Sequence, residues 1–101
     1  MYVEGVMVVG VTEIEGKKPY EKAKIKEGDI IIKIDEKEIH KANELIECVN
    51  SSRGRTLEVI YIRDGKEIET SISPTKTSTN EYKLGLWVRD GAARNRNSHI
   101  L

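Results

Sequence analysis

The chain has 101 residues, of which 38% are hydrophobic and 34% charged, and its 17 basic residues balance 17 acidic ones. A formal net charge of zero argues against a nucleic-acid interface, which needs a basic surplus on one face. The single cysteine, Cys48, excludes an internal disulfide and a zinc site built from several cysteines. No apolar run approaches the roughly 20 residues of a membrane-spanning helix, so we expect a soluble chain of one domain.

In chain order, the first half of the sequence predicts a strand, a short helix, a second strand and a longer helix. The apolar run Val6–Val9 predicts a strand buried on both faces. Pro19 suits the first turn of a short helix that continues over 20–24, because a missing N–H costs nothing there. The run Ile30–Ile34 is the clearest strand pattern, and apolar residues at helical spacing predict a helix over 41–50.

The second half of the sequence predicts a β-hairpin followed by a polar connection. Residues 57–63 and 66–73 alternate in side-chain character, and Asp64-Gly65 between them is typical of a tight hairpin turn. Because the elements come in the order strand, helix, strand, helix, hairpin, they indicate a small α+β domain with antiparallel strands. Phenylalanine is absent, so Ile, Val and Leu must supply the core.

Three segments of the chain differ in composition. Residues 1–75 carry the regular patterns and form the expected domain. Residues 76–90 are first polar and then apolar, which predicts a linker and a junction to a further domain. Residues 91–101 have no periodicity and are mostly small, basic or polar, so we expect a disordered tail.

The side chains that carry chemistry form no recognisable catalytic or metal-binding set. The carboxylates Asp29, Asp35, Glu36 and Glu38 lack the spacing of a calcium-binding loop, and we expect them to be solvated turn residues. Cys48 has no partner histidine by motif and is expected to be a half-buried helix residue. The sequence therefore predicts neither an enzyme nor a metal or cofactor site in this chain.

Three ordered segments resemble a bacterial PDZ domain, a peptide-binding fold. The first is Pro19–Ala23 followed by Ile25-Lys26-Glu27-Gly28-Asp29-Ile30-Ile31, the second is Ile34–Ile39 before a helix, and the third is the turn Arg63–Lys66. Together they cover about residues 5–73. The resemblance implies a partly open antiparallel β-barrel or sandwich that is capped by one short and one longer helix.

A narrower resemblance concerns the stage IV sporulation protein B family, secreted serine peptidases of endospore-forming bacteria. Gly85–Asp90 followed by Ala92-Ala93 is similar to the junction after the PDZ domain in that family, and Gly5–Gly10 is similar as well. The resemblance implies a membrane-anchored parent peptidase that acts in the space between the two membranes around the forespore. Residues 94–101 depart from the family pattern and are expected to be vector-derived or out of frame, with the peptidase residues outside this chain.

A PDZ domain binds a peptide as one more strand at a sheet edge, with a helix as the other wall of the groove. The resemblance assigns that wall to the helix over 41–50. The terminal carboxylate is held by N–H groups of an apolar-Gly-apolar loop, for which Leu84-Gly85-Leu86 is the best match. Two alternatives stay open, because Leu84–Val88 either completes the PDZ sheet or begins the neighbouring peptidase domain. The candidate groove residues are Leu84, Gly85, Leu86, Ala42, Leu45, Ile46 and Val49.

The resemblance also implies the partners, which are C-terminal or internal segments of membrane proteins or of the parent chain itself. Their binding positions substrate or restrains proteolysis. We expect a monomer, with one exception: the apolar end His99-Ile100-Leu101 is of the kind that PDZ grooves bind, and predicts that one molecule's tail enters a neighbour's groove. The alternatives are a PDZ domain of another bacterial envelope protease, trypsin-like or an intramembrane metalloprotease, and a structural spacer with a closed groove.

Overall fold

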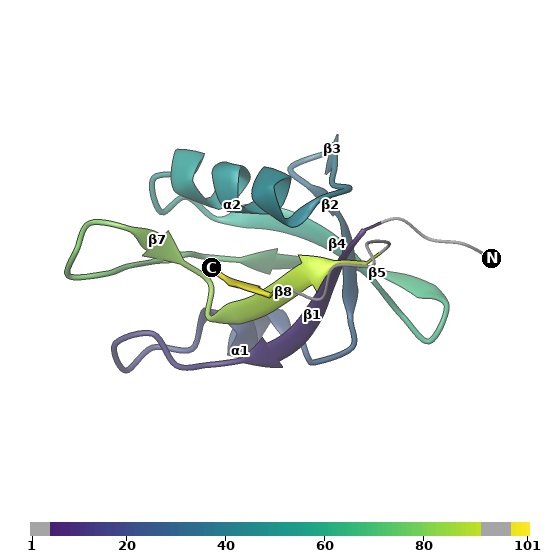
Figure 1. The fold of residues 1–101 in the computed structure, drawn as a ribbon, viewed down its shortest axis with the longest axis horizontal. Helices are drawn as coiled ribbons and strands as arrows, with labels where there is room; N and C mark the ends of the chain where they lie inside the picture. Colours follow the sequence, from purple (N-terminus) through teal and green to yellow (C-terminus); the bar gives the residue numbers. More distant parts are fainter. Residues whose placement is uncertain (1–4, 92–97) are drawn as a thin grey trace.

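An antiparallel sheet forms the centre of the protein in this computed structural model, which describes residues 5–91 and 98–101 (Figure 1). The elements are β1 (Val6–Val11), α1 (Pro19–Ala23), β2 (Ile30–Ile34), β3 (Lys37–Glu38), α2 (Ala42–Ser51), β4 (Leu57–Arg63), β5 (Lys66–Ile72), β6 (Thr75–Lys76), β7 (Tyr82–Lys83), β8 (Leu86–Asp90) and β9 (His99–Ile100). The strands of the sheet lie in the order β5-β4-β2-β1-β8-β9, with β3 paired to β2. The strands β6 and β7 form a separate two-stranded ribbon.

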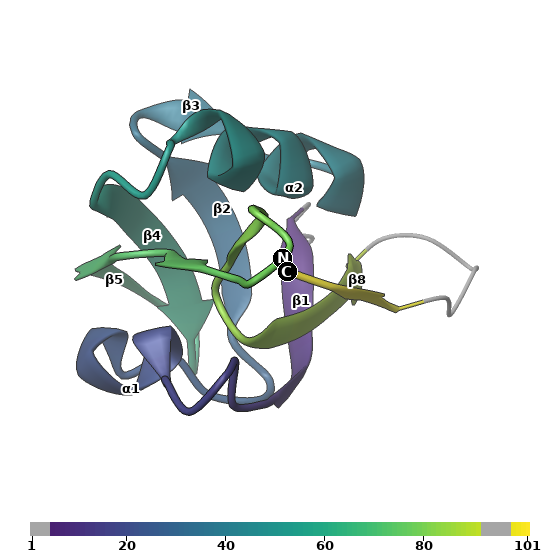
Figure 2. The ribbon, with the colours of Figure 1, turned by 90° about the vertical axis from the view of Figure 1, so that its left-hand side faces the viewer.

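The sheet is curved and remains open. Within the described residues its outer strands, β5 and β9, each pair on one side only, so the sheet does not close into a barrel. The helices α1 and α2 lie at opposite ends of the space that the curved sheet encloses (Figures 1 and 2). The predicted fold class, a small antiparallel α+β domain with one short and one longer helix, is confirmed.

The predicted hairpin is present as β4 and β5. Its strands keep one continuous register that ends with Arg63 opposite Lys66. The two residues between them, Asp64 and Gly65, both have positive φ, at 53° and 75°. Two successive residues of positive φ give the turn whose twist matches that of the flanking strands.

Both helices begin close to the predicted positions. α1 starts at Pro19 and is followed by Lys24 in the left-handed conformation, with a φ of 61°. α2 buries Leu45 and Val49 of the expected apolar stripe together with Ala42, whereas Ile46 is only partly buried. Among the described residues, no helix has the length and the apolar character that crossing a bilayer requires.

The core consists mainly of Ile, Val and Leu side chains, as expected, together with Tyr61. The strand β1 differs from the prediction, because it is fully buried on one face only. Val6 and Val8 are completely buried, whereas Met7 and Val9 are partly exposed. Successive side chains of a strand point to opposite faces of the sheet, and only one face of β1 packs into the core.

Asp29 is buried, which corrects the expectation of a solvated turn residue. Its side chain is 2% exposed and accepts hydrogen bonds of 2.8 and 2.7 Å from the Arg63 guanidinium. The Lys26 N–H donates a further bond of 2.8 Å to the same carboxylate. The expectation was wrong because Arg63 is 34 residues away in the chain, so no local pattern reveals the pair. The other three carboxylates of that set are exposed or half-exposed.

The end of the segment 91–101, for which disorder is expected, pairs with the sheet in the structure. His99–Ile100 pairs antiparallel with β8, and Leu101 is 2% exposed. The order comes from main-chain hydrogen bonds at a sheet edge, which the periodicity of side chains does not reveal. The rest of that expectation concerns residues 92–97, which lie outside the described residues.

Candidate functional site

The strand β8 lies beside β1, although most of the chain separates the two. The pairing is antiparallel, with Val88 opposite Val8, and the register shifts between Val8 and Gly10. The β6–β7 ribbon precedes this strand and turns the chain back toward the sheet (Figure 1). The structure therefore places most of the segment Leu84–Val88, whose position the sequence leaves open, in the same sheet as β1.

The loop Leu84–Leu86 before β8 is fixed against the end of β1 by Gly85. The Gly85 carbonyl accepts a hydrogen bond of 2.8 Å from the Thr12 N–H. Gly85 has a φ of +80°, and a Cβ at this position would lie 2.4 Å from the Thr12 carbonyl oxygen. Only glycine fits both the backbone conformation and the close approach.

Two successive N–H groups of this loop point at one acceptor. The Gly85 and Leu86 N–H groups donate to the main-chain oxygen of Leu101, over 2.7 and 2.9 Å. Successive N–H groups in a loop of this kind form a concave anion-binding nest. Both distances are those of well-formed main-chain hydrogen bonds.

The segment that carries Leu101 lies on the outer edge of β8 as an extra strand. Leu101 N–H donates to the Leu86 carbonyl over 2.9 Å, and the ladder continues with Ile100 opposite Trp87 and His99 opposite Val88. In both ribbon views the end of β9 lies between α2 and β8 (Figures 1 and 2). We use the term groove for the β8 edge, the Leu84–Leu86 loop and α2 together.

Two contacts fix α2 relative to the other parts of the groove. The Asp90 carboxylate at the end of β8 accepts a hydrogen bond of 2.6 Å from the Ala42 N–H, the first residue of α2. Beyond the other end of the helix, Gly54 packs against the Tyr82 ring of β7, so closely that a Cβ on Gly54 would lie 3.1 Å from it. The helix is thus attached at both ends to the segment that carries the loop.

The amino-acid sequence identifies the family to which this fold belongs. A family model described as PDZ domain matches residues 3–73, from the beginning of β1 through β5. The chain belongs to the PDZ domain family. A PDZ domain binds its peptide at a strand edge, and the matched range stops before β8.

Solved PDZ domains share this fold. The PDZ domain of an SdrC-like protein from Listeria monocytogenes is 21% identical, with a TM-score of 0.70, and the match covers 87% of this chain and 90% of that one. The PDZ domain of an SdrC-like protein from Listeria innocua is 22% identical, with a TM-score of 0.71 and coverage of 95% and 100%. The second domain of a listeria protein, solved in solution, is 23% identical, with a TM-score of 0.69 and coverage of 98% and 97%. At this level of identity the likeness concerns the fold.

Most of the predicted groove residues of the PDZ domain belong to its hydrophobic core. Its buried members include Ala42, Leu45, Val49, Leu84, Leu86, Val88 and Leu101. Ile46 is partly buried and packs against this core, and Gly85 is buried in the loop. The sequence had not assigned Asp90 to the site, because its hydrogen bond to α2 spans 48 residues and has no local signal.

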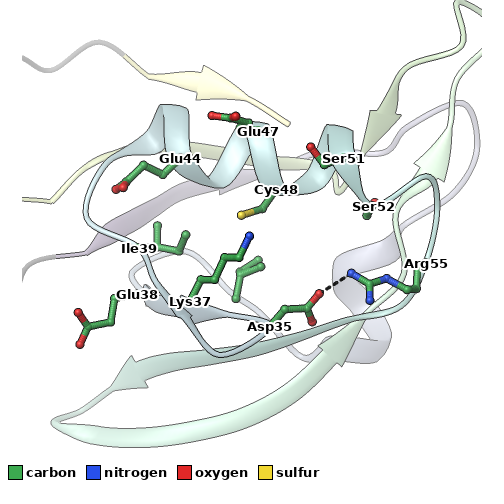
Figure 3. A pocket seen from close by; sticks show the side chains of 11 residues that line it. Asp35, Lys37, Glu38, Ile39, Glu44, Glu47, Cys48, Ser51, Ser52 and Arg55 are labelled. Atoms are coloured by element: carbon green, nitrogen blue, oxygen red, sulfur yellow. Dashed lines mark hydrogen bonds and ion pairs between the residues drawn. The ribbon is translucent and has the colours of Figure 1, made fainter.

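A cavity of about 510 Å³ lies on the flank of α2 that faces the β2–β3 turn, away from β8 (Figure 3). Cys48 and Lys37 point into it, and an ion pair of 2.7 Å between Asp35 and Arg55 borders it. Burial raises the pKa of the Cys48 thiol, against a smaller opposing effect of Lys37. A thiol with a raised pKa is a poor nucleophile.

In the described part of the chain, no group of three His, Cys, Asp or Glu side chains is arranged to hold a metal ion.

Proposed function

We propose that this PDZ domain recognises the C-terminal end of a partner polypeptide by adding it as a strand to the outer edge of β8. The observation that carries the proposal is the pair of N–H groups of Gly85 and Leu86, which hold the Leu101 oxygen at 2.7 and 2.9 Å. A partner's terminal carboxylate fits the same two donors. The main-chain ladder supplies affinity that does not depend on the ligand's sequence.

The preferred ligand ends in a branched aliphatic residue. Leu101 is 2% exposed and belongs to the hydrophobic core of the domain, together with Ala42, Leu45 and Val49 of α2. Burying a leucine side chain contributes about 1.5–3 kcal/mol, whereas a charged group there has no partner to offset its lost hydration. The penultimate position is less selective, because Ile100 is only partly buried.

A binding experiment with short synthetic peptides tests this function. The peptide Ser-His-Ile-Leu with a free carboxylate is titrated into the ¹⁵N-labelled Leu101→Asp variant, in which the chain's own end is no longer apolar. We expect the amide signals of Gly85 and Leu86 to shift on binding. The same peptide with a C-terminal amide, and a peptide that ends in Asp, serve as matched controls and should bind at least about tenfold more weakly. Equal binding of all three peptides would contradict the proposal.

We further propose that the domain belongs to a sporulation signalling serine peptidase, where it acts in the space between the two membranes around the forespore. The support is the similarity of Gly85–Asp90 and Gly5–Gly10 to the stage IV sporulation protein B family. In that setting the groove binds segments of membrane proteins or of the peptidase itself, and so positions substrate or restrains cleavage. The experiment is a peptidase assay of the natural gene product with and without Gly85→Ala. An unchanged cleavage rate, or a natural sequence without a peptidase domain, argues against this role.

A further inference from the structure

The chain's own last residues occupy the groove in the manner of a ligand. Leu101 makes three main-chain hydrogen bonds of 2.7 to 2.9 Å with Gly85 and Leu86. His99–Ile100 continues the ladder along β8. Any external peptide that adds to the same edge must use the same donors and acceptors, so the two ligands exclude one another.

The side chains of this segment alternate as those of a bound strand do. Leu101 is buried at 2% exposure, Ile100 is partly buried and His99 is exposed. The buried residue therefore lies next to the loop Leu84–Leu86, which holds its main-chain oxygen. Both the main chain and the side chains of the groove are thus engaged.

We propose that residues 98–101 of this sequence, which depart from the family pattern, act as an intramolecular competitor of the PDZ domain and occupy the groove until a stronger ligand displaces them. The inference rests on the proposed function, because it assigns regulation to the same groove. A tethered ligand faces its site at an effective concentration on the order of 1 mM. For a tail whose free peptide binds with a Kd of about 0.1 mM, the groove is about 90% self-occupied and external peptides bind about tenfold more weakly.

The same arithmetic favours the chain's own tail over that of a neighbouring molecule. A tail from a second copy reaches the groove only at its bulk concentration, which in most solution experiments lies well below the effective concentration of a tether. The sequence predicts a tail that enters a neighbour's groove, and this stays a prediction; within the single chain of the structure the same segment pairs with its own β8.

The test compares the 101-residue protein with its Leu101→Asp variant and with a form that has Gly-Ser added after Leu101. The variant places a charge in the hydrophobic core, and the extension adds two residues directly beyond the Leu101 oxygen that the loop holds. Ser71→Asp is the matched control, because it adds the same acidic group on the exposed face of β5, on the opposite edge of the sheet.

The first readout needs no external peptide. We expect the amide signals of Gly85 and Leu86 to shift, and their hydrogen exchange to accelerate at least about tenfold, in the variant and in the extended form, but not in Ser71→Asp. Unchanged exchange in both altered forms would overturn the inference. A shift whose size depends on protein concentration would also overturn it, since the tail would then come from a second copy.

The second readout is the affinity for a fluorescent peptide that ends in Ile-Leu with a free carboxylate. We expect Leu101→Asp to bind it about tenfold more tightly than the unaltered protein, with Ser71→Asp unchanged. If the unaltered protein and Leu101→Asp bind the peptide with equal affinity, the proposed self-competition is overturned. If the amide signals respond as expected but no peptide binds any form, self-occupation stands and the proposed recognition of partners fails.

Discussion

Trp87 and Ile100 lie directly opposite each other in the ladder between β8 and β9. Trp87 is the chain's single tryptophan and is 39% exposed. Directly opposed side chains on one face of an antiparallel pair are in contact distance. The fluorescence of this indole therefore reports whether the edge of β8 is covered.

We expect Leu101→Asp to shift the emission of Trp87 to longer wavelength, because loss of β9 exposes more of the ring to water. Addition of a peptide that ends in Ile-Leu should reverse the shift. Emission spectra at constant protein concentration provide the measurement, and Ser71→Asp provides the control. An emission maximum that is identical in all three proteins would contradict the assigned pairing.

Replacement of Gly85 by alanine is expected to destabilise the fold by at least about 1–3 kcal/mol, because the residue has positive φ and its Cβ meets the Thr12 carbonyl. The same change should abolish binding of a carboxylate by the loop. Urea unfolding measures the first effect and peptide titration the second. Gly65→Ala is a well-matched control, since Gly65 has a similar φ of +75° but nothing within 4 Å of the added Cβ. If both variants lose the same free energy of unfolding, the close approach of the added Cβ to the Thr12 carbonyl has no effect on stability.

Loss of the ion pair between Asp29 and Arg63 is expected to destabilise the fold. Asp29→Asn should lower the free energy of unfolding by roughly 2–4 kcal/mol, because Arg63 loses a carboxylate that accepts two of its hydrogen bonds. The value lies below that of a fully buried pair, since Arg63 is 30% exposed. The control is Asp64→Asn, the same change at an exposed turn position that accommodates asparagine well. Equal losses in urea unfolding would show that the pair does not contribute.

The thiol of Cys48 is expected to alkylate slowly at neutral pH, because burial raises its pKa and only the thiolate reacts. A cysteine whose pKa is higher in the folded than in the unfolded state favours folding at low pH. That contribution is lost as the pH rises through the folded-state pKa. Rates of reaction with iodoacetamide across the alkaline range give the measurement, with the urea-unfolded chain as reference. A folded protein that reaches half its maximal rate at a lower pH than the unfolded chain would contradict the assigned burial.

The elements that were predictable are those whose cause is local in the sequence. Asp64-Gly65 determines the β4–β5 hairpin by its backbone conformation alone, and the spacing of Ala42, Leu45 and Val49 determines the buried face of α2. The assignment of Leu84-Gly85-Leu86 as the carboxylate-binding loop stays a prediction, which rests on a pattern that fits the chemistry of anion binding.

What the sequence left open or missed depends on partners far along the chain. The place of β8 beside β1 depends on a ladder between residues about 80 positions apart, such as Val88 and Val8. The burial of Asp29 depends on Arg63 in another strand. Order at Leu101 depends on main-chain groups that every residue has, so no side-chain pattern indicates it.

The strand β9 also has a consequence for the behaviour of the protein in solution. It is the outermost strand on its side of the sheet and contributes only two residues, so the hydrogen-bonding edge it leaves exposed is short. Without it, the five-residue strand β8 would present its unpaired main-chain groups to other molecules, and such an edge promotes strand-to-strand association. A preparation that lacks these last residues would therefore be more prone to oligomerise and precipitate at high concentration.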